Sequence, residues 1–247
     1  MSPDTQTALA DLRADPSETV DPPEPETVNS PDIDSKAETH EDQLLRTCTS
    51  LLKQTAAQVT DSQTDWTAFL AMAGRLYKYS FPEQIMIYAQ RPNAVACADM
   101  ETWNRRMGRY IRSTSSAIAL LDVSGDTPAV RYVFDISDTR SGANARYPWL
   151  WQYQEREHED AVINALETSF GHSTEDDLAA RLDEIAEQLA LEYWNYHKEE
   201  ILEAAEGSFL EEYDELNVET AFRRAVSVSS AYAMMSRCNL EPDEYFQ

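Results

Sequence analysis

The chain has 247 residues, of which 42% are apolar and 10% aromatic, and its formal net charge is −25. A chain of this length and composition can bury a core as one large domain or two small ones. So negative a charge argues against a protein that holds duplex DNA over its whole surface, because that mode of binding depends on neutralised phosphates.

The charge is distributed unevenly along the chain. Residues 1–60 carry four basic and twelve acidic side chains, a balance of −8, and residues 147–247 carry six and twenty-four, a balance of −18. Residues 61–146 carry ten and nine, a balance of +1. A near-neutral, arginine-bearing middle thus lies between two acidic flanks, and a binding function is to be sought there first.

Cysteine content and hydropathy bear on where the protein works. The cysteines Cys48, Cys97 and Cys238 are odd in number and far apart, and they match neither a disulfide framework nor a CxxC metal pattern. A reducing, cytoplasmic setting is therefore expected. The N-terminus has no basic start and no apolar run, so no signal peptide is expected. No stretch approaches the ~20 apolar residues that span a bilayer, which predicts a soluble protein without a membrane segment.

Residues 1–40 are rich in Asp, Glu, Pro, Ser and Thr. Such a segment cannot bury enough apolar area to offset the entropy lost on ordering. We expect a disordered acidic tail, and a docking peptide for a partner is the alternative function of the same residues.

The first part of residues 41–146 contains sequence patterns that are typical of helix starts and ends. Ser62 with Asp65 and Ser80 with Glu83 have capping-box spacing, in which each partner can satisfy a free backbone N–H at the start of a helix. The second of these helices must stop before Pro92. The helices expected here span about residues 41–59, 62–78, 80–91 and 99–108.

The last of these helices would place Met100, Trp103 and Met107 on one face and end at Gly108. The face of a helix that carries the large apolar side chains is the one that is buried. Trp103 is therefore predicted to be structural rather than a stacking platform.

The hydrophobic period then changes from that of a helix to that of a strand. Residues 117–122 and 129–137 are rich in β-branched and aromatic side chains, and the second run alternates between two faces. Residues 110–112 could supply a third strand. The fold predicted for residues 41–146 is α+β, with a small antiparallel sheet covered by the preceding helices.

Residues 147–247 are expected to form an acidic, all-helical segment, broken at Gly171 and Gly207. It opens with the aromatic run at residues 147–153. Aromatic clusters dominate ordinary cores, which favours a role in docking the helices over a role as a base-stacking platform. The side chains expected to point inward are Val162, Ala165, Leu166 and Phe170, then Leu178, Leu182, Ile185, Leu189, Tyr193 and Tyr196, then Val218, Phe222 and Ala225.

The sequence lacks the common catalytic motifs. Its histidines, at positions 40, 158, 172 and 197, are scattered, and none belongs to a His-Glu-x-x-His pair. It has no Gly-rich phosphate loop and no Gly-x-Ser-x-Gly elbow. We therefore expect no enzymatic activity and no cofactor in this segment.

The clearest binding signal is a run of four arginines within eight residues, with no acid between them. Arginine pairs with phosphate and stacks on bases, and aromatic side chains add sequence-tolerant stacking. In the alternative interpretation, two of the arginines cap a helix and two pair with acidic neighbours. The candidate nucleic-acid contacts are Arg105, Arg106, Arg109 and Arg112, with Tyr110 or Tyr88 as stacking surfaces and Arg109 as the main contact.

Three motifs in this order resemble the N-terminal domain of ArdC-type antirestriction proteins: Lys78-Tyr-Ser-Phe-Pro-Glu-Gln-Ile-Met-Ile-Tyr-Ala-Gln-Arg-Pro92, Thr102-Trp-Asn-Arg105 with Arg109-Tyr-Ile-Arg112, and Tyr132-Val-Phe-Asp-Ile-Ser-Asp-Thr139. The likeness is greatest to the version at the start of very large proteins of bacterial conjugative elements, where it precedes helicase-like and methyltransferase-like regions. The chain ends on Tyr245-Phe-Gln247 without a closing signal, which is also typical of a piece of a longer protein.

The resemblance implies a single-stranded DNA-binding domain without sequence specificity. It implies DNA contacts by Gln90, Arg91, Arg109 and Arg112, and a buried, orienting role for Trp103. Where the family usually has a turn with glycine and lysine, this chain has Ser113-Thr-Ser-Ser116, so weaker DNA binding is expected.

Two functions remain open on the sequence alone. The first is a non-catalytic, single-stranded DNA-binding accessory domain of a mobile-element protein. The second is an acidic protein-interaction or DNA-mimic module, in which residues 147–247 present carboxylates to a basic protein partner. Salt-dependent binding of single-stranded DNA separates the two.

Overall fold

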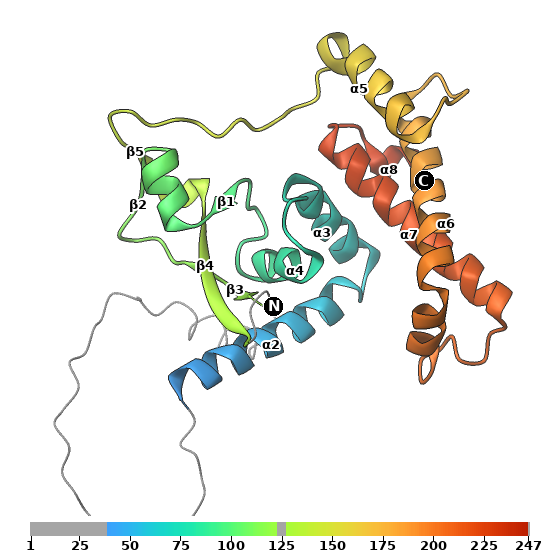
Figure 1. Ribbon diagram of the computed structural model, residues 1–247, viewed down its shortest axis with the longest axis horizontal. Coiled ribbons are helices and arrows are strands. Elements are labelled where there is room, and N and C mark those ends of the chain that lie inside the picture. The colour runs from blue at the N-terminus through green and yellow to red at the C-terminus, as the bar shows by residue number, and fades with distance from the viewer. Residues whose placement is uncertain (1–38, 123–126, 247) are drawn as a thin grey trace, which may run out of the picture. The chain divides into compact units, whose positions relative to one another are not determined.

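The computed structural model describes residues 39–122 and 127–246 (Figure 1). The expected disordered tail, residues 1–40, lies almost entirely outside these ranges. The described chain forms two compact units, one of residues 39–65 and 76–149 and the other of residues 66–75 and 150–246. The predicted fold class, α+β with a small antiparallel sheet followed by helices, is confirmed.

In the first unit, helices α2 (His40–Val59) and α4 (Phe81–Gln90) pack against each other and against the sheet. α4 begins at the predicted capping box, where the Ser80 N–H donates to the Glu83 carboxylate at 2.9 Å. The fully buried residues 85–87 follow within α4. Capping and hydrophobic periodicity thus place this helix where the sequence predicted it.

The sheet of the first unit has three antiparallel strands in the order β1 (Cys97–Ala98), β4 (Ala129–Asp135) and β3 (Ile118–Asp122). The predicted pairing of the two long runs is confirmed, with Ile118 opposite Val133. β4 is the central strand, and it is contacted by α2 as well as by both neighbouring strands.

The strand predicted near residues 110–112 forms as β2 (Arg109–Ile111), but it does not join this sheet. It pairs antiparallel with β5 (Thr139–Ser141) in a separate two-stranded sheet. The second predicted run ends early, because Ile136–Asp138 forms a 3₁₀ turn whose first N–H groups are capped by the Asp135 carboxylate. This turn leads the chain out of the three-stranded sheet and toward β2.

The helix predicted near residue 99 contains a π-helical turn, Thr102–Arg106, and Gly108 follows it with a φ of +61°. Trp103 is 2% exposed and its Nε1–H donates to the Phe134 carbonyl at 2.8 Å, so its predicted burial is confirmed. Met100, predicted on the same face, is 55% exposed. The wider π turn shifts the angular spacing of side chains and separates the two residues.

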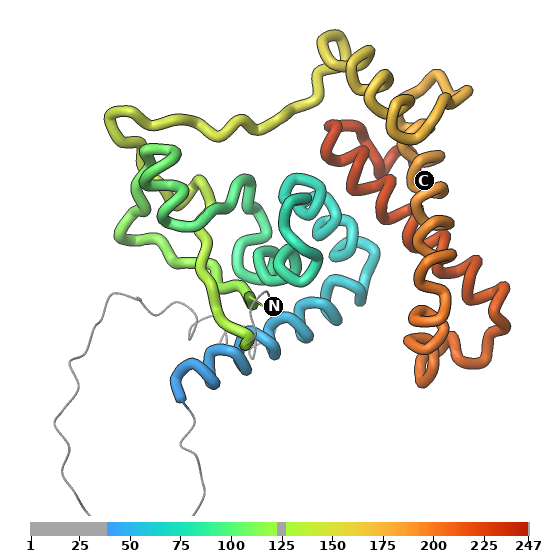
Figure 2. The backbone as a smooth tube through the Cα atoms, viewed as in Figure 1, coloured from blue at the N-terminus to red at the C-terminus, as the bar shows by residue number. Residues whose placement is uncertain are grey.

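The second unit is helical, and α6 and α7 pack along each other (Figure 2). The predicted breaks are confirmed: Gly171 and Gly207 both have positive φ and follow the ends of α5 and α6. No helix in the described ranges is both long and apolar enough to cross a membrane. The helices of this unit are α3 (Gln63–Arg75), α5 (Glu155–Phe170), α6 (Leu178–Ala205), α7 (Glu215–Arg237) and α8 (Pro242–Tyr245).

Most of α3 belongs to this second unit, although the sequence placed it in the preceding domain. The Trp66 Nε1–H donates to the Ser229 hydroxyl at 2.9 Å. Gly74 lies against α7 so closely that a Cβ there would be 2.6 Å from the carbonyl oxygen of Ala233. A glycine is therefore required for α3 to approach α7.

Part of the predicted inward face of the C-terminal helices is wrong. Tyr193 and Tyr196 are 51% and 86% exposed, whereas Trp194 is 2% exposed. Ala225 is exposed as well. The buried stripe of α6 passes through Ala186 and Ala190 to Trp194, because small side chains let α6 and α7 approach closely. Leu178, Leu182 and Ile185 are buried as predicted, so the prediction for α6 is wrong only in its C-terminal half. In α5, Ala165 and Phe170 were also predicted to point inward and are exposed.

Candidate nucleic-acid interface

Two acid-free segments of the sequence meet in the two-stranded sheet. Residues 102–112 contain four arginines and residues 139–149 contain two, and neither segment has an Asp or Glu. The β2–β5 pairing brings them together, and the Arg146 N–H then donates to the Met107 carbonyl at 2.7 Å. We call residues 102–112 and 139–149 the arginine ribbon; all of it lies in the first unit.

One face of the arginine ribbon carries an aromatic ring beside two cations. Tyr110 is 48% exposed and lies opposite Arg140, which is also exposed. Arg112, which directly follows β2, is exposed as well, and its Nε–H donates to the Thr139 carbonyl at 3.1 Å. A Cβ on Gly142 would lie 2.7 Å from the Tyr110 ring, so a glycine is needed beneath it.

Arg109 lies on the opposite face and is only 6% exposed. Its Nε–H donates to Thr139 Oγ1 at 2.7 Å and its Nη1 donates to Ser141 Oγ at 3.1 Å. The ring of Tyr147 covers the guanidinium, 5.1 Å from its centroid. Arg109 is therefore a structural group that ties β2 to β5. Arg109, expected to be the main nucleic-acid contact, thus has its guanidinium engaged within the fold, whereas Arg112 is exposed.

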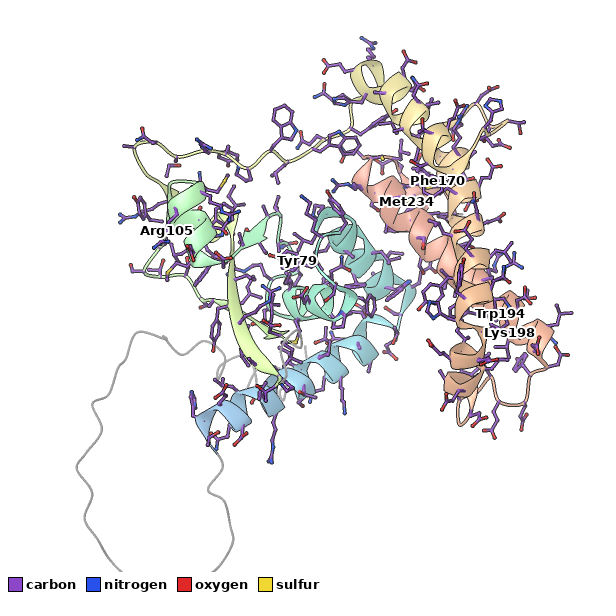
Figure 3. All side chains as sticks on the ribbon, viewed as in Figure 1. Tyr79, Arg105, Phe170, Trp194, Lys198 and Met234 are labelled. Carbon is purple, nitrogen blue, oxygen red and sulfur yellow. The ribbon has the colours of Figure 1, made fainter. Side chains whose placement is uncertain are left out.

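Arg105 and Arg106 are exposed on the π-helical turn, and Arg105 is labelled there in Figure 3. Arg105 pairs with Glu101 at 2.8 Å, with 80% and 70% of the two side chains exposed. Such a surface pair contributes roughly 0–1 kcal/mol, so a phosphate can displace Glu101 at little cost. Both arginines are accessible to a ligand of the arginine ribbon.

Gln90 is engaged within the fold. Its Nε2–H donates to the Ala119 carbonyl at 2.8 Å, and its Oε1 accepts the Ala119 N–H at 2.9 Å. The side chain thus completes the hydrogen bonds at the free edge of β3. The DNA contact implied for Gln90 by the resemblance competes with this pairing, so we assign Gln90 a structural role.

Arg91 and Tyr88 are held in the fold as well. Arg91 forms an ion pair with Asp138 at 3.0 Å. Tyr88 is half-buried, and burial, followed by the charge of Asp65, raises the pKa of its hydroxyl. The Asp138 carbonyl accepts the Arg112 N–H at 2.9 Å. Arg91 thus holds the side chain of the residue whose backbone carbonyl positions Arg112.

The corner between β4 and β5 is built on a buried carboxylate. Asp135 is 1% exposed and accepts the N–H groups of Val95, Ala96 and Ser137 at 2.8–2.9 Å. Burial raises the pKa of Asp135, but these hydrogen bonds, from Ser137 first, outweigh it and hold the pKa below its usual value. This charged corner fixes the direction in which the chain leaves β4 and enters β5, and with it the position of the arginine ribbon.

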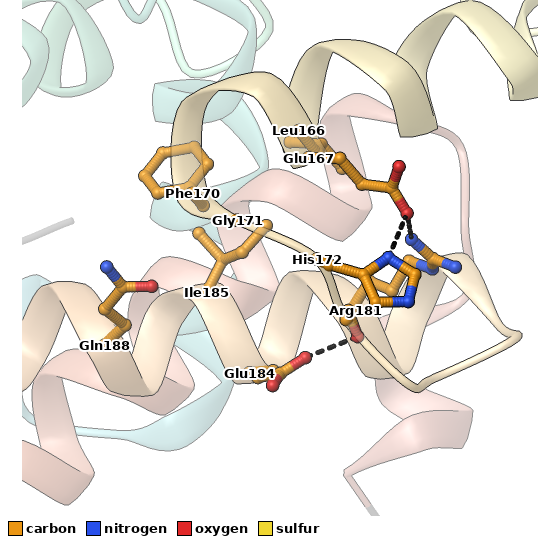
Figure 4. Close-up of a pocket in the computed structure, with 10 residues that line it drawn as sticks. Leu166, Glu167, Phe170, Gly171, His172, Arg181, Glu184, Ile185 and Gln188 are labelled. Atoms are coloured by element: carbon orange, nitrogen blue, oxygen red, sulfur yellow. Dashed lines mark hydrogen bonds and ion pairs between the residues drawn. The ribbon is translucent and has the colours of Figure 1, made fainter.

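A small pocket of the second unit lies between α5 and α6 (Figure 4). Glu167 accepts hydrogen bonds from Arg181 and from His172, each at 3.1 Å. Hydrogen bonding to Arg181 and then to His172 lowers the pKa of Glu167. The Ser173 hydroxyl donates to a different carboxylate, that of Glu184. The serine and the histidine are therefore not arranged as a nucleophile and its base.

Elsewhere in the described residues, groups that could react or bind metal are few. No group of three or more His, Cys, Asp or Glu there could hold a metal ion. Burial raises the pKa of the Cys48 thiol to about 11 and that of Cys97 to about 12. Such thiols stay protonated at neutral pH and are poor nucleophiles.

No family model, curated protein or solved structure matches this chain. A functional assignment therefore depends on the geometry of the arginine ribbon and on the three sequence motifs within residues 78–139. Sequence reasoning overlooked two members of the ribbon, Arg140 and Arg146, because each is isolated in the sequence. The signal that could have found them is the absence of Asp and Glu from residues 139–154.

Proposed function

We propose that this chain contains a non-catalytic module that binds single-stranded DNA through the arginine ribbon, as an accessory domain of a mobile-element protein of the antirestriction type. The supporting observation is the β2–β5 pairing, which joins two acid-free segments that together hold six arginines, on a chain of charge −25. The neighbouring Glu101 pairs with one of the six, Arg105. The acidic remainder repels phosphates, so binding is directed to this surface. A cytoplasmic setting, in line with the free cysteines, suits this proposal.

The exposed face of the arginine ribbon suits a single strand in particular. The exposed Arg112 and Arg140 can donate to phosphate oxygens, and the exposed ring of Tyr110, opposite Arg140, is a surface on which an unpaired base can stack. A duplex hides its base faces within the helix, so Tyr110 would add nothing to its binding. Pairing with phosphate and stacking on a ring both tolerate any base, so we expect binding without sequence specificity.

The test is fluorescence anisotropy with an oligothymidylate at salt concentrations from about 50 to about 200 mM. Removing two phosphate contacts by Arg112→Ala with Arg140→Ala should weaken binding and flatten the salt slope by about 1.4, since each contact to a single strand contributes about 0.7. The matched control is Arg46→Ala with Lys53→Ala on α2, which removes the same charge from the same unit.

Equal losses in the two double variants would mean that binding follows net charge rather than the arginine ribbon. Absence of binding at low salt would refute the proposal and favour the acidic interaction module. That alternative has its own supporting observation: residues 192–219 hold ten acidic residues and one basic residue around exposed apolar side chains. The most exposed of these are Tyr196, Phe209 and Leu216, at 86%, 83% and 71%. Its partner would be a basic protein, as in a DNA mimic.

A further inference from the structure

The C-terminal half of α6 carries an aromatic side chain that packing does not explain. Tyr196 is 86% exposed, and within residues 39–122 and 127–246 its side chain forms neither a hydrogen bond nor a ring contact. Trp194, two residues earlier, is 2% exposed and belongs to a core cluster with Ala205 and Val218. The contact between α6 and α7 therefore requires Trp194 but places no demand on position 196.

The part of α6 that presents this ring is held against α7. The Tyr193 ring stacks on His197, with 4.3 Å between centroids, and on Phe222 of α7, with 6.1 Å between centroids. Lys198, labelled in Figure 3, forms an ion pair with Glu215 in the first turn of α7. The surface is therefore largely formed before a ligand arrives, which lowers the entropy lost on binding.

The stretch of chain around the ring is strongly acidic. Residues 192–219 hold ten acidic residues and one basic residue. Lys198 pairs with Glu215 and Arg223 pairs with Glu219, which leaves eight of the ten acids without a lysine or arginine partner in the described chain. Such a surface repels the phosphates of nucleic acids and of lipid headgroups, and it attracts cationic ligands.

The exposed ring narrows the kind of cation. Glu192 is exposed and lies four residues before Tyr196, so the two are neighbours on one face of α6. A guanidinium is planar and weakly hydrated, and it can lie on a tyrosine ring while it pairs with a neighbouring carboxylate. A lysine ammonium is a strongly hydrated point charge and gains less from the ring. Mimicry of DNA would explain the carboxylates of this surface but not its exposed ring.

We propose that this face of α6 is a docking surface for an arginine-bearing basic segment of another protein, in which one arginine stacks on Tyr196 and pairs with Glu192. It is a second binding function of the chain, on the second unit, and it does not depend on DNA binding by the arginine ribbon of the first unit. It also gives the acidic C-terminal helices a partner of defined chemistry.

The test measures, by fluorescence anisotropy at low salt, the binding of nonaarginine and nonalysine, two peptides of equal length and charge. The wild-type chain should bind nonaarginine more tightly. Tyr196→Leu should weaken nonaarginine binding by roughly 2- to 5-fold, the value of one exposed cation–π contact, and should change nonalysine binding little. Tyr196→Phe keeps the ring and should retain the preference for arginine. Because the side chain is exposed, neither variant should impair folding.

Two matched controls separate the ring and its neighbouring charge from general effects. Trp149→Leu removes a ring that is 92% exposed in an acid-free segment of the first unit, and it should leave both peptide affinities unchanged. Glu192→Gln should weaken nonaarginine binding more than Glu157→Gln, which removes the same charge from an exposed position of α5.

The same preference for nonaarginine in the wild type and in Tyr196→Leu would overturn the proposal, because binding would then not involve the ring. Absence of peptide binding at low salt would overturn it as well. Sedimentation velocity tests a second copy as the occupant: self-association that both Tyr196→Leu and Arg112→Ala abolish would overturn a separate partner. Tyr196→Leu should bind oligothymidylate as the wild type does, so these outcomes leave the proposed function standing.

Discussion

The burial of Arg109 predicts that replacing it damages folding of the first unit before it damages DNA binding. Arg109→Ala removes two hydrogen bonds from a charged donor, worth about 1.5–3 kcal/mol each, and a cation–π contact worth about 0.5–2 kcal/mol. The lower values apply, because Ser141 and Tyr147 are themselves exposed. We therefore expect a loss of about 3.5 kcal/mol in the stability of the β2–β5 pairing.

Amide hydrogen exchange is the appropriate assay, because a chain of two units need not unfold in a single transition. The Gly142 N–H, bonded to the Gly108 carbonyl, and the Arg112 N–H, bonded to the Asp138 carbonyl, report on the ribbon. Their exchange should accelerate by roughly 400-fold, the equivalent of that free energy. The control, Arg105→Ala, removes an exposed side chain and should change stability by less than about 0.5 kcal/mol.

The result that would refute this reasoning is unchanged exchange in Arg109→Ala together with lost oligothymidylate binding. The Arg109 guanidinium would then be the main DNA contact that the sequence favoured, and its contacts with Thr139, Ser141 and Tyr147 would be energetically unimportant.

Four further predictions concern residues of the first unit. Trp103→Ala should cost about 3–5 kcal/mol in denaturant unfolding, whereas Trp103→Phe loses mainly the hydrogen bond to the Phe134 carbonyl, about 1 kcal/mol. The pKa of Asp135 is lower in the folded protein than in the unfolded chain, where it is about 3.9. The ionised carboxylate therefore stabilises the fold at pH values above about 3.9, and this stability is lost as the pH falls through the folded pKa. In urea titrations below about pH 4, Asp135→Asn should therefore show a smaller pH dependence than wild type. Cys97, with a pKa of about 12, should resist alkylation in the native protein at neutral pH and react after denaturation. Gly142→Ala should disturb the arginine ribbon, since its Cβ would lie 2.8 Å from the Gly108 carbonyl oxygen. Oligothymidylate binding should therefore fall, while the amide hydrogen exchange of the second unit is unchanged.

The parts of the fold that the sequence predicted depend on local interactions. Capping boxes and helical periodicity located the helices of the first unit, and alternation located the hairpin of β3 and β4. The β2–β5 pairing could not be predicted in this way. Its strands have three residues each, too few for a recognisable period, and their meeting depends on the buried Asp135 corner between β4 and β5.

For the same reason, only part of the candidate site could be predicted from the sequence. Strand alternation shows that Arg109 and Arg112 cannot both face a ligand, but only the partner strand decides which of them is buried. Thr139 and Ser141 lie across from β2 and accept hydrogen bonds from Arg109. The resemblance likewise assigns Gln90 to DNA, whereas its pairing with Ala119, 29 residues away, cannot be predicted from the local sequence.

The membership of α3 in the second unit has a consequence for the synthesis of the chain. The Trp66 side chain finds its partner, Ser229, only 163 residues later. At about 5–20 residues per second, a ribosome needs roughly 8–30 s to cover that interval. Throughout it, the residues of α3 that meet α7, Trp66 and Gly74, have emerged without their partner helix. The nascent chain therefore offers a hydrophobic segment to chaperones or to neighbouring chains for much longer than helix formation itself takes, and slow synthesis should increase aggregation.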